Sequence, residues 1–520
     1  MSEMSKSHGM AHGALSETPT DVGESDPTAK RTGVKAIARN VYLNDRWLQC
    51  ALLAFMAVYY GFVLNVTATH YLMNKTFNSM LDHLVHGQVD VDPNVIGYEG
   101  FLHNGHVYSY FGITCALLRL PLLLFHRLDL DVTVWSCLVA VCLAGMMKIR
   151  AVLFLRRHCG ATPASEGVFA LMLTYIVLGG AEVGYLKSSI FQEVIFWAVA
   201  FAAVFVYFAV KGIVNGQFTV ATLSWMALAA GLALLTRVST GIGLCAAFAL
   251  LLFVLMIEEL YARRTIFTRR FLAPVAVLTA LIILVGTVNY LRWGNPATFA
   301  DYKSYIIANN QRDHRDALLM QAYGTFNLVR TPYTLGYYFF PVFAMQGPHG
   351  HLLFQETQTR LFSDIELPPS SFLLTDLLPF CFIALLAIAL WKHRNLGSPP
   401  AGKWAAAVAL GLFVPCALML TLIWMTYRYR MEFYPEIDFL AFLGLYATVS
   451  NPALLAWVRR RHRWMLAATM VSIASAFAAM MLYWFSDWGP YQRLLGGGLV
   501  HYYMQNGYLY LKNSGFAFIY

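Results

Sequence analysis

WLQCALLAFMAVYYGFVLN, residues 47–65, is free of charged side chains and long enough to cross a bilayer. An acidic segment follows it, MLDHLVHGQVDVDP at residues 80–93, which contains Asp82, Asp90 and Asp92. After EGFLHNGHVYSYFG, residues 99–112, the chain becomes apolar again. We therefore predict a membrane span followed by an acidic loop at the membrane surface. An enzyme that activates an acceptor hydroxyl there needs at least one carboxylate, whereas a transporter has little use for three outside the membrane.

The composition indicates an integral membrane protein. The chain of 520 residues is 58% hydrophobic and 12% charged, with a mean hydropathy of +0.55. Soluble domains carry about 25% charged residues. The formal net charge of +9 does not require a nucleic-acid partner, because basic residues of a membrane protein gather in its cytoplasmic loops. The partners that we expect are therefore membrane lipids and membrane-associated substrates.

Long apolar runs predict an all-α polytopic fold with about eleven transmembrane helices. The predicted spans are residues 47–67, 132–155, 166–186, 190–210, 219–236, 239–257, 271–291, 372–391, 404–425, 435–450 and 464–485. The run at 113–125 is too short, and Arg119 and Pro121 interrupt it. We interpret it as an interfacial or re-entrant segment.

The positive-inside rule gives the orientation. Basic residues gather in the N-terminal tail, at the inner end of the second span from Lys148 to Arg157, and in later loops such as 263–270 and 459–463. This pattern predicts a cytoplasmic N-terminus and an external C-terminus. In a bacterium the protein would lie in the inner membrane and its external side would be the periplasm.

The predicted organisation has three parts. Residues 1–46 form a polar, disordered cytoplasmic tail, residues 47–485 form the transmembrane domain, and residues 486–520 form an external C-terminal segment. The transmembrane domain carries two long external loops, at 68–111 and 292–371. A periplasmic transferase would need a lipid-linked donor, because no nucleotide-sugar pool is expected there.

The first external loop supplies the candidate catalytic carboxylates. In an extended DVDP segment, Asp90 and Asp92 point to one face, where the pair can bind a divalent cation such as Mg²⁺ or Mn²⁺, or one member can act as general base. Asp82 lies in FNSMLDHLVHG, residues 77–87, whose apolar residues repeat at helical spacing. We predict an amphipathic helix on the membrane surface there, ending near Gly87. For all three carboxylates, simple solvation of a loop or helix face is the alternative.

Other charged and aromatic residues outline a predicted pocket that includes Glu99, Tyr110 and Glu193. Tyr110 can stack on a sugar ring or belong to the interfacial aromatic belt. Carboxylates near a span are costly and indicate function by default, so Glu193, at the external start of its span, is a candidate. Glu193 can instead pair with Lys187 or Arg237 for structure alone.

Three arginines are candidates for a lipid phosphate. Arg237 lies in LALLTRVSTG at the outer end of its span, and TYRYRMEFYPE places Arg428 and Arg430 on the outer side, against the positive-inside pattern. Guanidinium groups bind phosphate through two hydrogen bonds. Headgroup binding or snorkelling is the alternative.

The order of these motifs resembles the bacterial GT-C glycosyltransferases, polytopic enzymes that use polyprenyl-phosphate sugars. The resemblance covers most of residues 47–450 and rests on the acidic helix after the first span and on DVDP, EGF, YSYFG, ALLRLP, the span start with Glu193, LLTRVS, NYLRWGNP and RYRMEFYP. It implies a catalytic aspartate in the first external loop, which here falls on Asp82, Asp90 or Asp92. The WWD signature of oligosaccharyltransferases is absent, which argues against transfer of a whole glycan to protein.

The resulting hypothesis is a membrane hexosyl- or pentosyltransferase that moves one sugar, with inversion, from a polyprenyl-phosphate donor to a periplasmic glycan, lipid or protein. A first-loop carboxylate would deprotonate the acceptor, and Arg237, Arg428 and Arg430 would neutralise the departing phosphate. The rival hypothesis is a lipid-linked-sugar flippase or transporter. The rival predicts polar residues lining several spans at mid-membrane.

Overall fold

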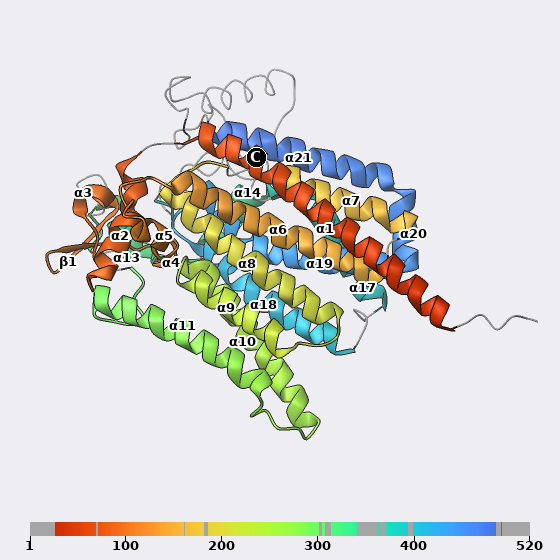
Figure 1. The fold of residues 1–520 in the computed structure, drawn as a ribbon. Helices are drawn as coiled ribbons and strands as arrows, with labels where there is room; N and C mark the ends of the chain where they lie inside the picture. The colour runs from red at the N-terminus through yellow and green to blue at the C-terminus, as the bar shows by residue number, and fades with distance from the viewer. Residues whose placement is uncertain are drawn as a thin grey trace, which may run out of the picture. The chain divides into compact units, whose positions relative to one another are not determined.

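The computed structural model describes residues 27–68, 71–160, 162–180, 186–300, 304–306, 314–340, 361–363, 371–393, 399–484 and 490. The chain divides into two units, Met1–Cys50 and Ala51–Tyr520. The second unit holds the helical bundle and the candidate site. Figure 1 shows its long helices α6, α8, α9, α10 and α18 running side by side.

A helix covers most of each predicted span. These helices are α1 (Pro27–Val66), α6 (Thr133–Cys159), α7 (Pro163–Leu178), α8 (Ile190–Val214), α9 (Val220–Leu234), α10 (Val238–Tyr261), α11 (Arg269–Trp293), α17 (Leu377–His393), α18 (Pro399–Thr421), α19 (Tyr434–Ser450) and α21 (His462–Trp484). The prediction of an all-α polytopic membrane fold is confirmed.

The predicted count of eleven spans is not confirmed. Within the described residues, seven helices are long and apolar enough to cross a membrane. The number rises to eight if α19 and α20 (Pro452–Arg460), which meet at a bend of 99°, form one span. Among the helices that do not pass are α7, α9 and α17, with 16, 15 and 17 residues. These are shorter than the roughly 20 residues that a straight crossing needs.

Helix α1 begins well before the predicted first span. Residues 27–46, which the sequence analysis assigns to a disordered tail, are helical. This part of the chain is rich in Ala, Lys and Arg, which favour helix, and it starts with a proline, which suits a first helical turn. Residues 1–26 lie outside the described part of the chain.

The bundle packs closely through small residues. α8 lies against α6, α9 and α19, and α10 lies against α18. A Cβ added at Gly411 would come within 2.1 Å of the Ala247 backbone nitrogen, and one at Gly243 within 2.4 Å of Pro415 Cδ. Small residues at such crossings let helix backbones approach each other, which is the usual source of helix association in a bilayer.

Lys148 lies inside the bundle, contrary to the prediction that it marks the inner end of its span. α6 continues for eleven residues beyond it to Cys159. The Lys148 side chain is 3% exposed, and its Nζ lies 3.0 Å from Asp438 Oδ2 of α19. The ion pair explains how a lysine is retained among apolar helices, because an unpaired charge there is expensive.

The segment between α1 and α4 (Thr114–Leu117), which the sequence analysis predicts as the first external loop, contains short helices and a hairpin. Its elements are η1 (Leu72–Lys75), α2 (Thr76–Val85), α3 (Pro93–Ile96), η2 (Gly97–Glu99), β1 (Phe101–His103) and β2 (His106–Tyr108). The predicted amphipathic helix is present as α2, with Phe77, Met80 and Leu81 buried and Asp82 exposed. The hairpin was not predicted. Its turn residues Asn104 and Gly105 have φ of 51° and 80°, as Asn-Gly turns favour.

The remaining described segments complete this end of the bundle. They are α4 (Thr114–Leu117), α5 (Leu120–Leu124), α13 (His314–Tyr323), η5 (Leu328–Arg330), α14 (Thr331–Phe339), α16 (Phe372–Thr375) and η8 (Tyr427–Glu432). α4 and α5 replace the apolar run 113–125, in agreement with its prediction as a short segment. In the predicted external loop 292–371, residues 301–303, 307–313, 341–360 and 364–370 lie outside the described residues. The same holds for the C-terminal segment 486–520, apart from residue 490.

Candidate functional site

The ends of several helices meet around a cavity of about 210 Å³. Its walls come from the end of the first loop, the junction of α9 and α10, the last turns of α11 and the segment after α18. The first loop approaches the α9–α10 junction closely, since Thr114 N donates to Leu235 O at 3.3 Å. Gly112 permits this approach, because a Cβ there would lie 1.8 Å from the same carbonyl oxygen.

Arg237 lines this cavity from the start of α10. Its Nε contacts Glu432 Oε1. Glu432 also accepts hydrogen bonds from Ser239 Oγ at 2.7 Å and Thr240 Oγ1 at 2.6 Å. The Glu432 side chain is 1% exposed, so it balances the arginine from within the protein and fixes its position.

Tyr429 connects Arg237 with Arg428. The Tyr429 ring lines the cavity, and its centroid lies 5.5 Å from Arg237 Cζ and 5.8 Å from Arg428 Cζ. Arg428 Cζ also lies 4.8 Å from the ring centroid of Phe191. The structure therefore places two of the three predicted phosphate-binding arginines beside one aromatic ring.

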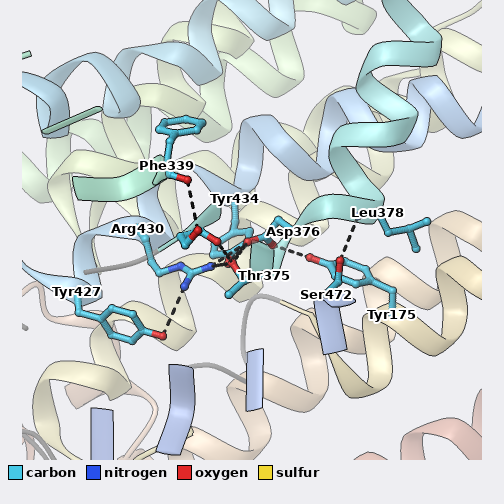
Figure 2. Close-up of polar contacts among 10 residues, drawn as sticks. Tyr175, Phe339, Thr375, Asp376, Leu378, Tyr427, Arg430, Tyr434 and Ser472 are labelled. Carbon is cyan, nitrogen blue, oxygen red and sulfur yellow. Dashed lines mark hydrogen bonds and ion pairs between the residues drawn. The ribbon is translucent and has the colours of Figure 1, made fainter. Parts of the chain in front are cut away.

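Arg430 lies in a separate buried cluster. Its Nη2 contacts Asp376 Oδ2 at 2.8 Å, and the two side chains are 2% and 1% exposed. Figure 2 shows the same guanidinium among Thr375, Tyr427 and Tyr434. Arg430 does not line the described cavity. A buried carboxylate pairs with Arg430 in this position, and its contact with a donor phosphate stays a prediction.

Glu193 also has a buried ionic partner rather than a place in the cavity wall. Arg119 Nη1 lies 2.6 Å from Glu193 Oε1, and Arg119 Nη2 lies 2.9 Å from Oε2. Ser136 Oγ donates to Oε1 at 2.6 Å. The structural alternative considered for Glu193 was right in kind, but its partner is Arg119 and not Lys187 or Arg237. The pair fastens the start of α8 to the segment between α4 and α5.

Asp90 is held by two histidines of the first loop. Its Oδ1 lies 2.8 Å from His83 Nδ1 and its Oδ2 lies 2.7 Å from His106 Nδ1. Partial burial raises the pKa of Asp90, but the two hydrogen bonds and the charge of His83 outweigh this effect, and the net pKa lies below its usual value. Asp90 is therefore an ionised carboxylate bridging α2 and β2.

Asp92 and Asp82 have different surroundings. Asp92 caps α3, where its Oδ1 accepts from Asn94 N at 2.8 Å. Asp82 is 55% exposed on α2. The structure thus gives Asp90 and Asp92 separate partners, although they are two residues apart. Among the described residues, no group of three or more His, Cys, Asp or Glu side chains is arranged to hold a metal ion.

Glu99 and Tyr110 flank the hairpin in the sequence, one before β1 and the other after β2. Tyr305 Oη donates to Glu99 Oε2 at 2.8 Å. Burial raises the pKa of Glu99, and the Tyr305 hydrogen bond and the charge of Arg428 offset part of that rise. Tyr110 lines the cavity and packs edge-on against Phe101, with ring centroids 5.7 Å apart.

Arg292 is a site residue that the sequence analysis missed. It lies at the end of α11 in NYLRWGNP, lines the cavity, and is 3% exposed. Its Nη1 donates to Phe111 O at 2.9 Å, whereas its Nε has no hydrogen-bond partner. In the sequence, the position of Arg292 could have indicated it, because an arginine at the predicted outer end of a span departs from the positive-inside pattern.

Comparisons with known proteins gave no sequence relative and three solved structures. No protein-family model and no curated protein matches the chain. It is similar, at 12% identity and a TM-score of 0.43, to the archaeal oligosaccharyltransferase AglB from Archaeoglobus fulgidus in complex with an inhibitory peptide and a dolichol-phosphate. Two further structures of the Archaeoglobus fulgidus oligosaccharyltransferase, one with Zn and sulfate and one tethered to an acceptor peptide, give TM-scores of 0.42 and 0.39 at 12% and 13% identity. The matches cover 82–84% of this chain, and the chain spans only 52–55% of those proteins.

Proposed function

We propose that this chain is a membrane glycosyltransferase of the GT-C type, which transfers one sugar from a polyprenyl-phosphate donor to an acceptor outside the membrane. The observation that carries the proposal is the cavity at the helix ends, whose wall has both cationic and apolar side chains. Arg237 and Arg292 line it together with apolar side chains such as Val285, Val288 and Met419. Cationic and apolar walls in one cavity suit a ligand with a phosphate at one end and a hydrocarbon chain at the other.

The proposed reaction needs a base and a site for the leaving group. A carboxylate of the first loop removes the proton of the acceptor hydroxyl, whose oxygen attacks the anomeric carbon of the sugar. The bond between that carbon and the phosphate oxygen breaks, the configuration inverts, and polyprenyl phosphate departs with the bonding electrons. Arginines in the cavity stabilise the negative charge that grows on this phosphate.

Asp90 is the proposed base, with Asp92 and Asp82 as the alternatives. Asp90 lies beside the hairpin whose Tyr108 packs on Trp293, next to Arg292, with ring centroids 5.6 Å apart. The two histidine contacts keep the carboxylate ionised and oriented. The described residues do not fit a bound cation, so we derive no step through Mg²⁺ or Mn²⁺.

The proposed setting follows the orientation predicted from the basic residues. The N-terminus would be cytoplasmic, and the cavity would face the periplasm of a bacterial inner membrane. The donor would then be a lipid-linked hexose or pentose, and the acceptor a periplasmic glycan, lipid or protein. The bundle does contain buried charged residues, as the flippase hypothesis predicts. They form two ion pairs, Lys148 with Asp438 and Arg430 with Asp376, and none of the four residues lines the cavity.

Mass spectrometry of lipid-linked sugars and surface glycans, in cells with and without the gene, tests the proposal. Loss of the transferase should leave polyprenyl-phosphate sugar accumulated and one sugar missing from a glycan, lipid or protein. The same missing sugar, with donor retained in the cytoplasmic leaflet and not in the outer one, would instead support the flippase. Re-expression of Asp90→Asn should not restore the missing sugar. Asp129→Asn, at an exposed position between α5 and α6, should restore it.

A further inference from the structure

Asp376, at the junction of α16 and α17, is a buried carboxylate that joins segments far apart in the sequence (Figure 2). Tyr175 of α7 donates its hydroxyl to Oδ1 at 2.6 Å. Arg430 Nη2 of η8 donates to Oδ2 at 2.8 Å, and Tyr434 Oη, at the start of α19, donates to the same oxygen at 3.1 Å. A buried carboxylate is tolerated when such donors satisfy its oxygens. Asp376 is therefore a fixed point to which Arg430 is bound.

The segment that carries Arg430, η8, has two rows of side chains with different destinations. A 3₁₀ helix turns once every three residues, so the residues i and i+3 lie on the same side. Tyr427 and Arg430 form one row and belong to the buried cluster, where Arg430 Cζ lies 5.5 Å from the Tyr427 ring centroid. Tyr429 and Glu432 form another row, and both meet Arg237 at the cavity. One rotation of η8 about its axis therefore sets the place of both rows.

The backbone gives η8 little rigidity of its own. Runs of 3₁₀ helix longer than about four residues are uncommon, because their hydrogen bonds are poorly aligned, and η8 has six residues. On the side away from the cavity, Tyr427 stacks on Tyr483 of α21 with ring centroids 5.1 Å apart, and Arg430 is bound to Asp376. Stacked rings can slide past each other, whereas a guanidinium group bonds in a fixed, planar geometry. The contact with Asp376 is therefore the one of these two that resists rotation.

We infer that Asp376 and Arg430 are positioning residues for the cavity. Their contact sets the rotation of η8, and this rotation holds the Tyr429 ring in the cavity wall and Glu432 against Arg237. Neither Asp376 nor Arg430 lines the cavity, so the pair acts through η8 and not by touching a ligand. The inference goes beyond the proposed function, because it applies to whichever ligand the cavity takes.

Replacement of both charged partners separates positioning from stability. Loss of one partner leaves an unpaired buried charge, whereas loss of both is often neutral for stability. The test variant is Asp376→Leu with Arg430→Met, made in the full chain in nanodiscs. The matched control is Lys148→Met with Asp438→Leu, which removes another ion pair of the bundle and leaves Asp376 and Arg430 in place. Arg430→Lys, which keeps the charge but loses the planar fork, decides the question if the double variant does not fold.

Hydrogen exchange of the peptide 424–433 reports on η8 without any ligand. In the wild type, Tyr429 N donates to Thr426 O at 3.1 Å and Phe433 N donates to Arg430 O at 3.0 Å, which should slow the exchange of both amides. We expect exchange to be roughly tenfold faster in the double variant, unchanged in the control and intermediate in Arg430→Lys. A pair that only adds stability would lower the midpoint of thermal unfolding and leave this exchange unchanged below it. That result would overturn the inference.

Binding of a labelled polyprenyl monophosphate to the same proteins measures the effect on the cavity, and this readout rests on the proposed function. We expect the affinity to fall roughly tenfold in the double variant, as for loss of one charged hydrogen bond, and to stay unchanged in the control. Weaker binding with unchanged exchange would make Arg430 a ligand contact and would overturn the inference. Absence of binding in the wild type would count against the proposed function, and the exchange result would still decide the inference.

Discussion

The charge on Asp90 depends on two neighbouring side chains, and this dependence makes it sensitive to pH. His83 and His106 stabilise the ionised carboxylate, so that its pKa in the folded protein lies below the usual 3.8. The unfolded chain binds the proton more readily, so this contribution to stability is complete above the usual pKa and is lost as the pH falls toward the folded value.

Asp90→Asn should therefore reduce thermal stability near neutral pH, and by less as the pH falls below about 4. The midpoint of thermal unfolding in detergent, measured for both proteins across this range, gives the comparison. A difference that stays the same or grows as the pH falls below about 4 would contradict the lowered pKa of Asp90. Asp129→Asn, whose carboxylate is 69% exposed, serves as the control.

Glu193 provides a contrasting prediction, because its charge is fully buried. Glu193→Gln leaves Arg119 buried with its counter-charge removed, which should lower the free energy of unfolding by about 3–5 kcal/mol. The folded fraction should retain sugar transfer, since Glu193 does not line the cavity. Unfolding in mixed micelles and activity per folded molecule would measure both effects. Unchanged stability with lost transfer would return Glu193 to the pocket.

At the scale of elements, the contact between the first loop and the α9–α10 junction shapes the cavity. Gly112→Ala should separate these segments, because the new Cβ would meet the Leu235 carbonyl oxygen at 1.8 Å and neither backbone can yield easily. We expect a stability loss of about 1–3 kcal/mol and weaker binding of polyprenyl phosphate. Gly167→Ala in α7, where a Cβ meets nothing within 4 Å, should change neither. Tight donor binding by Gly112→Ala would exclude this contact from the site.

Elements were predictable where a local pattern specifies them. Apolar runs located the helices, and the spacing of Phe77, Met80 and Leu81 located α2. The Asn-Gly pair at 104–105 is a local hairpin signal that the sequence analysis did not use. Roles that depend on distant partners were not predictable. Arg430 pairs with a residue 54 positions away and Arg119 with one 74 positions away, and nothing local in either segment indicates these pairs.

For the whole molecule, the cavity is useful to a periplasmic transferase only if the helix ends that form it face outward. The orientation predicted from basic residues places residues 262–268, after α10, in the cytoplasm, and residues 294–300, after α11, outside. Alkaline phosphatase fused after residue 264 should therefore be inactive, and the same reporter fused after residue 296 should be active. The reverse pattern would place the cavity in the cytoplasm and remove the argument for a lipid-linked donor.

Sugar transfer by the purified protein is the decisive test of the proposed activity. The full chain in nanodiscs would be incubated with a polyprenyl monophosphate carrying a radiolabelled sugar and with periplasmic glycans, lipids and proteins from cells lacking the gene. The account predicts that label leaves the donor and becomes covalently attached to an acceptor, with free polyprenyl phosphate released, in wild type and not in Asp90→Asn. Donor that stays intact with every acceptor fraction, or equal transfer by Asp90→Asn, Asp92→Asn and Asp82→Asn, would contradict it.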